Sequence, residues 1–372
     1  MSRDTPAASG NAGLILPGNT VQNFASRVTN ADVLTLATSL LSTEVTDLET
    51  IDLQQNRIGE VDETDPEAHL SAVRALSKLF INNVDGYKCA LVRVDLSGNE
   101  LNSDCISILC TALRNNKTIK SLNLRRNPMG NEGGMFVAEM LEGNTCLEAL
   151  DIGDTDLGHG SLIAMATALS LNESISSINM DNPLLRTLEE EALQHLGKML
   201  QTNSTLTHVS LCKHHISDIG AQVLAERLLD NKTLTSLHLR ANKIGGFGSE
   251  ALAALLLSGS RIIELDLTAN RMTDEGAKAF ETVLSASATL ETLCLGYNSI
   301  EDDGLARLAH GVLRNDDSGL KKLLVWGNDF GENAPAAFEA LHAQSAGKLH
   351  MDILPYTVDG VVMLAKKIAD ED

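Results

Sequence analysis

The feature that most constrains the fold of this chain is a segment that recurs every 28 residues. LVRVDLSGNEL begins at residue 91, and related segments begin at residues 119, 147 and 175, each 28 residues further on. A second series with the same step begins at residues 206, 234, 262 and 290, and single copies begin at residues 48 and 320. A fixed period of this length is typical of an elongated array, in which each unit buries its apolar face only against its neighbours.

Within each copy, aliphatic residues alternate and an Asn follows, in the pattern L-x-x-L-x-L-x-x-N-x-L. The alternation predicts a short strand with one buried face. Between copies, stretches such as SDIGAQVLAERLLDN (217–231) have apolar residues at helical spacing. We expect helix N-caps at Ser217 and Thr273, followed by Asp218 and Asp274 in the first turn. Each unit is therefore expected to run strand, turn, helix, turn.

The pattern is the leucine-rich repeat signature, and a 28-residue unit with a full helix resembles the ribonuclease-inhibitor type, which Ran GTPase-activating protein and the sensor arms of NOD-like receptors share. The resemblance implies an α/β horseshoe solenoid of about 10–11 repeats, with parallel strands on the concave face and helices on the convex face. We expect residues 1–13 to be disordered, residues 14–345 to form the repeat domain, and residues 346–372 to form a C-terminal cap or tail.

The Asn of the pattern is expected to turn inward and form a ladder of hydrogen bonds to backbone groups of neighbouring turns. Each such backbone group would cost about 1–3 kcal/mol if it were buried unpaired. In the middle repeats, Thr155, Pro183 and His214 replace the Asn, and Asn182 could substitute for Pro183 through a small shift of register. The predicted ladder consists of Asn56, Asn99, Asn127, Asn242, Asn270, Asn298 and Asn328.

The segment VSLCKHHI (209–216) contains residue types that bind metals or transfer protons. However, strand alternation places Cys212 and His214 on opposite faces, whereas a metal centre needs its ligands on one side. His208 and His238 face outward on adjacent strands, but no motif fixes a nucleophile or carboxylate between them. GxxxxGK[ST], HExxH, GxSxG and CxxC are absent from the sequence. We therefore predict no catalytic residue, no metal and no cofactor.

The net charge of −21 at pH 7 bears on the partners. A surface this acidic repels phosphate groups, which argues against direct binding to nucleic acid or to an anionic membrane. No apolar run approaches the roughly 20 residues that span a bilayer, and residues 1–13 lack the apolar core of a signal peptide. We expect an intracellular protein whose partners are other proteins rather than small-molecule substrates.

The outward positions of the strands are expected to form the partner-binding face. Carboxylates dominate its first half, and apolar and aromatic residues its C-terminal end. Trp326 is the only Trp, and two readings of it stay open: it contacts a partner as an interface hot spot, or the C-terminal tail folds back and covers it. The predicted partner-binding residues are Trp326, Tyr297, Leu324, Arg240, His238, Arg125, Arg126 and Asp151.

Two C-terminal segments carry a more particular resemblance. LLVWGNDFG (323–331), followed by LPYTVDGVVMLAKK (354–367), resembles the leucine-rich repeat-containing protein 34 family, which is associated with ciliated and germ-line cells. The resemblance implies a non-enzymatic scaffold within a large assembly, a structural subunit of a ciliary or flagellar axoneme complex such as a radial spoke. A nuclear or nucleolar location is the alternative that the same resemblance offers.

An alternative function is GTPase activation, by resemblance to Ran GTPase-activating protein. That class inserts an arginine to stabilise charge during phosphoryl transfer, and Arg57, beside the acidic loop 59–68, would be that residue here. The residues around Arg57 do not match the arginine loop of that family, and the long acidic tail of Ran GTPase-activating protein is missing. A third reading is a stoichiometric inhibitor like ribonuclease inhibitor, but the abundant cysteines and concave aromatics of that protein are sparse here.

Overall fold

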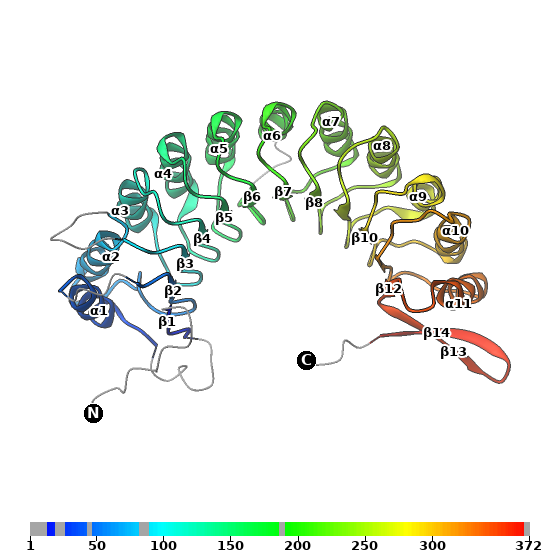
Figure 1. Ribbon diagram of the computed structural model, residues 1–372, viewed down its shortest axis with the longest axis horizontal. Helices are drawn as coiled ribbons and strands as arrows, with labels where there is room; N and C mark the ends of the chain where they lie inside the picture. The colour runs from blue at the N-terminus through cyan, green and yellow to red at the C-terminus, as the bar shows by residue number, and fades with distance from the viewer. Residues whose placement is uncertain (1–12, 19–26, 43–46, 82–88, 186–189, 368–372) are drawn as a thin grey trace. The chain divides into compact units, whose positions relative to one another are not determined.

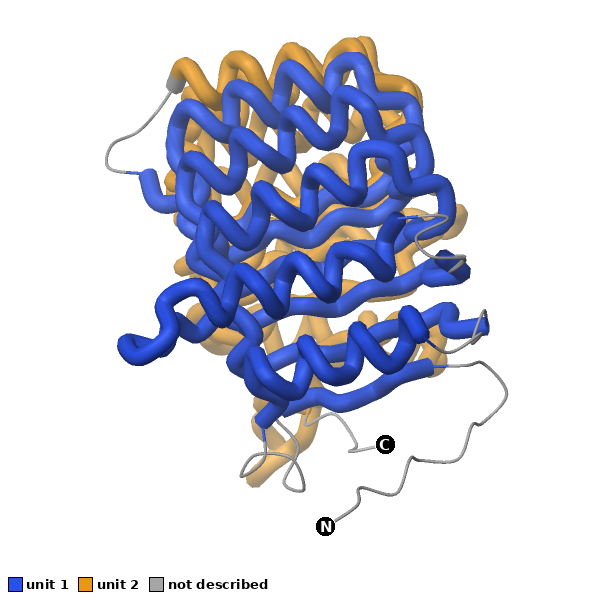
Figure 2. Tube along the Cα trace, turned by 90° about the vertical axis from the view of Figure 1, so that its left-hand side faces the viewer, with its two compact units in different colours: residues 1–186 blue, residues 187–372 orange. Residues whose placement is uncertain are grey.

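The computed structural model describes residues 13–18, 27–42, 47–81, 89–185 and 190–367. Most of the segment predicted to be disordered lies outside these ranges. Gly13 is the exception and corrects that boundary, because it begins the first strand and pairs with Thr50. The chain forms two compact units, Met1–Arg186 and Thr187–Asp372, which Figure 2 colours separately. Each unit is described by itself.

The first unit is a stack of parallel strands that alternate with helices along the chain (Figure 1). Its strands are β1 (Gly13–Ile15), β2 (Thr50–Asp52), β3 (Arg93–Asp95), β4 (Ser121–Asn123), β5 (Ala149–Asp151) and β6 (Ser177–Asn179). Its helices are α1 (Asn30–Ser42), α2 (Ala68–Lys78), α3 (Ser103–Leu113), α4 (Gly130–Gly143) and α5 (His159–Leu171). Successive strands pair in register, so equivalent positions of consecutive repeats lie side by side.

The second unit repeats this arrangement and ends in a hairpin. Its parallel strands are β7 (His208–Ser210), β8 (Ser236–His238), β9 (Glu264–Asp266), β10 (Thr292–Cys294), β11 (Lys322–Leu324) and β12 (His350–Met351). Its helices are α6 (Glu190–Thr202), α7 (Asp218–Leu228), α8 (Gly246–Leu257), α9 (Thr273–Ala286), α10 (Asp302–Leu313) and α11 (Asn333–Ser345). The hairpin consists of β13 (Ile353–Val358) and β14 (Val361–Lys366).

Both units confirm the predicted α/β solenoid, because β1 to β6 in the first unit and β7 to β12 in the second are parallel strands in sequence order, with helices between them. The parallel sheet continues past residue 345, since β12 pairs with β11 inside the segment predicted to be a cap or tail. The core lies between strands and helices and is mainly aliphatic, with Phe80, Phe280 and Phe338 as its largest fully buried side chains. The division into repeat domain and cap stays a prediction.

Inward Asn side chains connect consecutive repeats. The Nδ2 group of Asn127 donates to the Leu124 carbonyl at 2.7 Å and to the Leu96 carbonyl of the preceding repeat at 2.9 Å. Its Oδ1 accepts from the backbone N–H groups of Asn99, at 2.9 Å, and Leu101, at 3.1 Å. One amide therefore satisfies four backbone groups in two repeats. The Nδ2 groups of the other ladder residues likewise donate to the carbonyl three positions earlier: buried Asn56, Asn99, Asn242, Asn270, Asn298 and Asn328.

The middle repeats fill the ladder position differently. Thr155 is buried, and its hydroxyl donates to the Ile152 carbonyl. His214 is buried as well. The predicted substitution of Asn182 for Pro183 is wrong: Asn182 is exposed and donates to the Asp154 carboxylate at 2.8 Å. Its positive φ of 56° turns the side chain away from the core, so that Pro183 itself takes the buried position.

A second set of buried Asn side chains fixes the turn from helix to strand. The Asn144 Nδ2 group donates to the Leu113 carbonyl of the preceding repeat at 2.7 Å, and its Oδ1 accepts from Cys146 and Leu147 N–H groups. Equivalent bonds are made by buried Asn116, Asn172 and Asn231 and by half-buried Asn315. The repeats are thus joined by side-chain amides at both ends of the strand.

One of the two predicted helix caps is confirmed. Ser217 is the N-cap of α7, although its side chain makes no capping bond, whereas α9 begins at Thr273 itself, so the predicted cap at Thr273 is wrong. Asp218 and Asp274 lie in the first turns of these helices, as predicted. Asp218 also acts on the next repeat, because its carboxylate accepts from Gly245 and Gly248 N–H groups at the start of α8, at 2.6 and 2.8 Å. Such a bond satisfies the free N–H groups of a helix end, and it adds a third link between neighbouring repeats.

The ladder makes a stability prediction. Asn127→Ala removes the acceptor or donor of four backbone groups, so we expect the free energy of unfolding to fall by about 2–4 kcal/mol. Asn182→Ala is the control: its side chain is exposed, and because Ala fits the positive φ of this position less well than Asn, we expect a loss of at most about 1 kcal/mol. Urea unfolding followed by circular dichroism measures both. Equal losses in the two variants would contradict the structural role of the ladder.

Candidate functional site

The ends of the strands in the first unit carry a row of polar side chains. The last residues of β2 to β6 are Asp52, Asp95, Asn123, Asp151 and Asn179. Each side chain accepts the backbone N–H two positions later, at 2.9–3.1 Å. Neighbouring strands are also linked, because Asn123 donates to Asp95 at 2.9 Å and Asn179 donates to Asp151 at 3.3 Å. We call these five residues the strand-end row.

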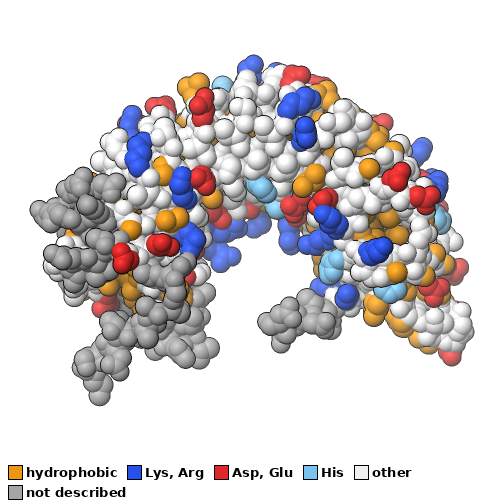
Figure 3. Space-filling model, in the orientation of Figure 1, with side chains coloured by type: hydrophobic (Ala, Val, Ile, Leu, Met, Phe, Trp, Pro, Cys, Tyr) orange, Lys and Arg blue, Asp and Glu red, His pale blue; other side chains and the backbone are white. Residues whose placement is uncertain are grey.

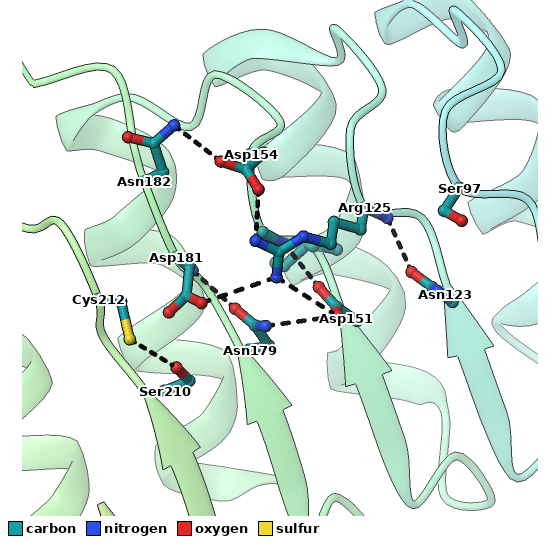
Figure 4. Close-up of polar contacts among 12 residues, drawn as sticks. Ser97, Asn123, Arg125, Asp151, Asp154, Asn179, Asp181, Asn182, Ser210 and Cys212 are labelled. Atoms are coloured by element: carbon teal, nitrogen blue, oxygen red, sulfur yellow. Dashed lines mark hydrogen bonds and ion pairs between the residues drawn. The ribbon is translucent and has the colours of Figure 1, made fainter. Parts of the chain in front are cut away.

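Arg125 lies at the centre of a carboxylate cluster beside this row (Figure 4). Its guanidinium forms an ion pair with Asp154 and lies 3.8 Å from the Asp151 carboxylate and 3.7 Å from the Asp181 carboxylate. The four residues come from three successive repeats, and Figure 4 shows the carboxylates pointing toward the guanidinium. One positive charge thus faces three negative charges, and the cluster stays acidic.

Burial and charge act against each other in this cluster. Burial lowers the pKa of Arg125, but the neighbouring carboxylates outweigh it and the pKa is raised. For Asp151, burial raises the pKa, and the charges of Asp181 and Asp154 add to that, whereas the Gly153 N–H and Arg125 oppose it. Arg125 is therefore held fully charged, and its main role is to permit carboxylates to gather at one place.

Arg126 and Asp151 are the other binding residues predicted in the first half of the face. Arg126 follows Arg125 directly, has a φ of 56° and is exposed. Asp151 belongs to both the strand-end row and the Arg125 cluster. Asp154 and Asp181 were not among the predicted binding residues. Asp154 follows the strand by three positions, where the pattern alone does not indicate the direction of a side chain.

In the second unit, His238 lies in a Ser–His–Glu group that the sequence did not indicate. The His238 Nε2 atom is 3.2 Å from the Ser236 hydroxyl and 3.3 Å from the Glu264 carboxylate, and the same hydroxyl donates to Glu264 at 3.0 Å. In a catalytic triad the two ring nitrogens face the hydroxyl and the acid separately. Here one nitrogen faces both, so the group cannot relay a proton. Arg240 is exposed nearby in sequence.

The aromatic residues at the end of the second unit stack on its core. The Trp326 ring is half-buried and lies 6.1 Å from the Phe330 ring, which meets buried Phe338 edge-on at 6.4 Å. Tyr297 is 53% exposed and covers the backbone of Gly327, where a Cβ atom would lie 2.4 Å from its ring. Leu324, at the end of β11, is half-buried.

The segment beyond residue 345 contacts the backbone of Trp326. The Asp352 carboxylate accepts the Val325 N–H at 2.9 Å and the Trp326 N–H at 3.1 Å. The C-terminal segment therefore holds the loop that carries the indole. Whether the exposed part of the indole contacts a partner stays a prediction.

Arg57, the residue required by the GTPase-activating alternative, has acidic surroundings. Its guanidinium is half-exposed and lies 3.7 Å from the Glu60 carboxylate. The hollow that it lines also includes Glu60, Asp62 and Glu63. Carboxylates in this position oppose the approach of nucleotide phosphates.

The described part of the chain offers little for catalysis. Within it, no three His, Cys, Asp or Glu side chains gather so that they could hold a metal ion. Burial raises the pKa of Cys294 to about 12, so its thiol stays protonated at neutral pH. Cys212 lies 3.3 Å from the Ser210 hydroxyl. Among the described helices, none has the length and apolar character needed to cross a bilayer.

Comparison with known proteins agrees with the repeat geometry. The leucine-rich repeat family model matches residues 115–138, 202–225, 230–253, 262–280 and 286–309. The chain contains leucine-rich repeats. Each match spans the end of one helix or its following turn together with the next strand region and helix, which is the unit seen in the structure. Leucine-rich repeat proteins of this kind are protein-interaction scaffolds.

Several known proteins are similar in sequence to parts of this chain. It is 40% identical over 74 residues to mouse leucine-rich repeat-containing protein 34, a match that covers 20% of the chain and 18% of that protein. It is 27% identical over 136 residues to human NACHT, LRR and PYD domains-containing protein 13, covering 36% of the chain and 13% of that protein. These matches span less than a fifth of either relative. A Listeria monocytogenes internalin aligns with 92% of the chain and 86% of its own, with 16% identity and a TM-score of 0.46.

The Arg125 cluster makes a pH-dependent prediction. The raised pKa of Asp151 means that the folded state holds its proton more tightly, so its contribution to stability falls as the pH rises above the ordinary value of 3.8. Arg125→Leu removes the charge that opposes this shift. We expect a loss of about 1–3 kcal/mol at about pH 7 and a smaller loss at about pH 3.5. Urea unfolding at both pH values tests this, with exposed Arg126→Leu as control. A loss in Arg125→Leu that does not depend on pH would contradict it.

The Asp352 contact makes a spectroscopic prediction, because Trp326 is the only Trp in the chain. Asp352→Ala leaves the Val325 and Trp326 N–H groups without their acceptor, so we expect the loop to loosen and the Trp emission to shift to longer wavelength. Asp329→Ala, which removes an exposed carboxylate from the same loop, is the matched control. An emission maximum that stays unchanged in Asp352→Ala would refute the role of this contact.

Proposed function

We propose that this chain is a non-catalytic scaffold that binds a basic segment of a partner protein along the strand-end row of its first unit. The observation that supports this most directly is the Arg125 cluster, in which three carboxylates face one guanidinium. The row adds Asp52 and Asp95 at equivalent positions of earlier repeats. Strands in a parallel sheet lie about 4.8 Å apart, so these carboxylates form a line that an extended Lys- or Arg-rich segment can follow.

Electrostatics also favour such a partner over an acidic one. The chain carries a net charge of −21, which attracts basic proteins over long range and speeds their association. Arg125 neutralises one carboxylate of the cluster and leaves the others to pair with an incoming cation. The arrangement therefore selects a protein partner by charge and by the spacing of its basic residues.

The finer part of the proposal is the assembly to which this scaffold belongs. We propose a structural role in a ciliary or flagellar axoneme complex such as a radial spoke, with the nucleus or nucleolus as the alternative location. This part rests on the resemblance of residues 323–331 and 354–367 to the leucine-rich repeat-containing protein 34 family and on the partial similarity to the mouse protein of that name.

Binding of a basic probe tests the surface. We expect a fluorescein-labelled Arg/Ser peptide to bind the purified chain with an affinity that falls at high salt, and a Glu/Ser peptide not to bind. The double variant Asp95→Asn, Asp181→Asn keeps the side-chain shape and should weaken binding about three- to tenfold. Asp104→Asn with Glu142→Gln makes the same change of charge on α3 and α4 and is the matched control. Equal weakening in both double variants would assign binding to net charge and refute the proposed surface.

Proximity labelling in ciliated cells tests the assembly. A labelling enzyme fused to the chain should recover axonemal proteins when it is expressed at the native level. Recovery of nucleolar proteins without axonemal ones would refute the axonemal role and favour the alternative location. Because the peptide experiment uses purified protein, its result is independent of this one.

A further inference from the structure

The C-terminal hairpin has two faces of different environment. Strands β13 and β14 pair antiparallel from Ile353↔Lys366 to Val358↔Val361, and the turn residues Asp359 and Gly360 both have positive φ, of 50° and 81°. This is the backbone that a two-residue hairpin turn prefers. Side chains directly opposite each other in such a ladder lie on the same face. The register therefore assigns every hairpin side chain to one of two faces.

One face of the hairpin is apolar and open. It consists of Leu354, Tyr356, Val358, Val361, Met363 and Ala365. The first five are 42–63% exposed. Figure 3 shows hydrophobic side chains along the hairpin, at the lower right of the view. We call these six residues the open hairpin face.

A helix covers part of the opposite face. Ile353 is buried, and Pro355 and Leu364 are half-buried, whereas Thr357 and Lys366 on the same face are exposed. Helix α11 contacts both strands of the hairpin, and within Figure 1 the hairpin lies beside it. One layer of helix thus packs on one side of a two-stranded sheet.

The sequence of β14 is typical of a strand that is covered on both faces, including the open hairpin face. VVMLA (361–365) is an unbroken apolar run. A strand with one face in water alternates apolar and polar residues, whereas a continuous apolar run is typical of a strand buried on both faces. An exposed apolar hairpin with free edges would also promote aggregation. The open hairpin face therefore has the composition of an interface.

We propose that the open hairpin face binds an amphipathic helix of a partner protein. A strand added to the edge of the hairpin would leave this face uncovered. Its exposed apolar area is roughly 400 Å², about half of the ~800 Å² per partner of a standard interface, so the partner helix would be one part of a larger contact between the two proteins. Six-residue strands span roughly 20 Å, which matches about 13 residues of helix.

The opposite face provides the precedent for this occupant. Helix α11 has 13 residues and lies against the same two strands. A partner helix would complete a helix–sheet–helix sandwich, with the continuous apolar run of β14 in its middle. This surface consists of residues of the second unit and is separate from the strand-end row, so the two binding proposals are independent.

A designed helical probe tests the proposal. The probe is a labelled 14-residue peptide with Leu at positions spaced three and four apart and Lys and Glu in equal number elsewhere, so that its net charge is zero. The control peptide has the same composition in scrambled order, without the helical apolar face. We expect the chain to bind the helical peptide at least tenfold more tightly in fluorescence anisotropy, and the peptide to gain helical circular dichroism on binding. Equal affinity for both peptides would overturn the proposal.

Variants locate the contact. Met363→Glu and the milder Val361→Thr change exposed side chains of the open hairpin face, and we expect them to weaken binding by at least tenfold and about threefold. Leu171→Glu changes an equally apolar side chain, 79% exposed at the end of α5, and should leave the affinity unchanged. In the wild-type chain, hydrogen exchange should slow in residues 353–366 when the helical peptide is added. Slowing elsewhere instead, or a dimer in light scattering that Met363→Glu dissociates, would overturn the partner helix as occupant.

Discussion

The buried amide of Asn127 satisfies two carbonyls and two N–H groups in its own repeat and the one before. Short three-residue strands supply few ladder bonds of their own, and the turns that follow them would bury unpaired backbone groups without this side chain. The ladder also fixes the register between strands. The outward side chains of the described strands therefore depend on the ladder for their positions.

The register between strands also decides which surface side chains of neighbouring repeats meet. Because equivalent positions lie side by side, the side chain at the end of one strand meets the side chain at the end of the next. Asn123 then bonds Asp95, Arg125 pairs with Asp151, and Ser236 and His238 meet Glu264. A polar side chain of one repeat thus pairs with a polar side chain of the next repeat. Negative charge accumulates where the carboxylates of neighbouring repeats outnumber the cations. The acidic cluster around Arg125 is such a place.

The amino-acid pattern predicted the solenoid, the positions of strands β2 to β11 and the ladder residues, because these depend on contacts that recur with the period of the sequence. It did not predict the capping bonds of Asp218, the outward turn of Asn182 or the bond between Ser236 and Glu264. The residues in each of these contacts are about 28 positions apart in the chain, so local propensity does not specify that they meet. At Asn182, the positive φ of 56° also sets the direction of the side chain.

The sequence by itself determined that this chain stacks leucine-rich repeats, since alternating Leu positions and a recurring Asn allow few other ways to bury apolar surface. The tertiary structure decided which polar side chains meet and which apolar ones stay open. The unbroken apolar run of β14 could be read in the sequence, but only the hairpin register separates a face packed on α11 from the open face of Tyr356 and Met363. The physical reason is that burial depends on which neighbour covers a side chain, and strand pairing assigns that neighbour.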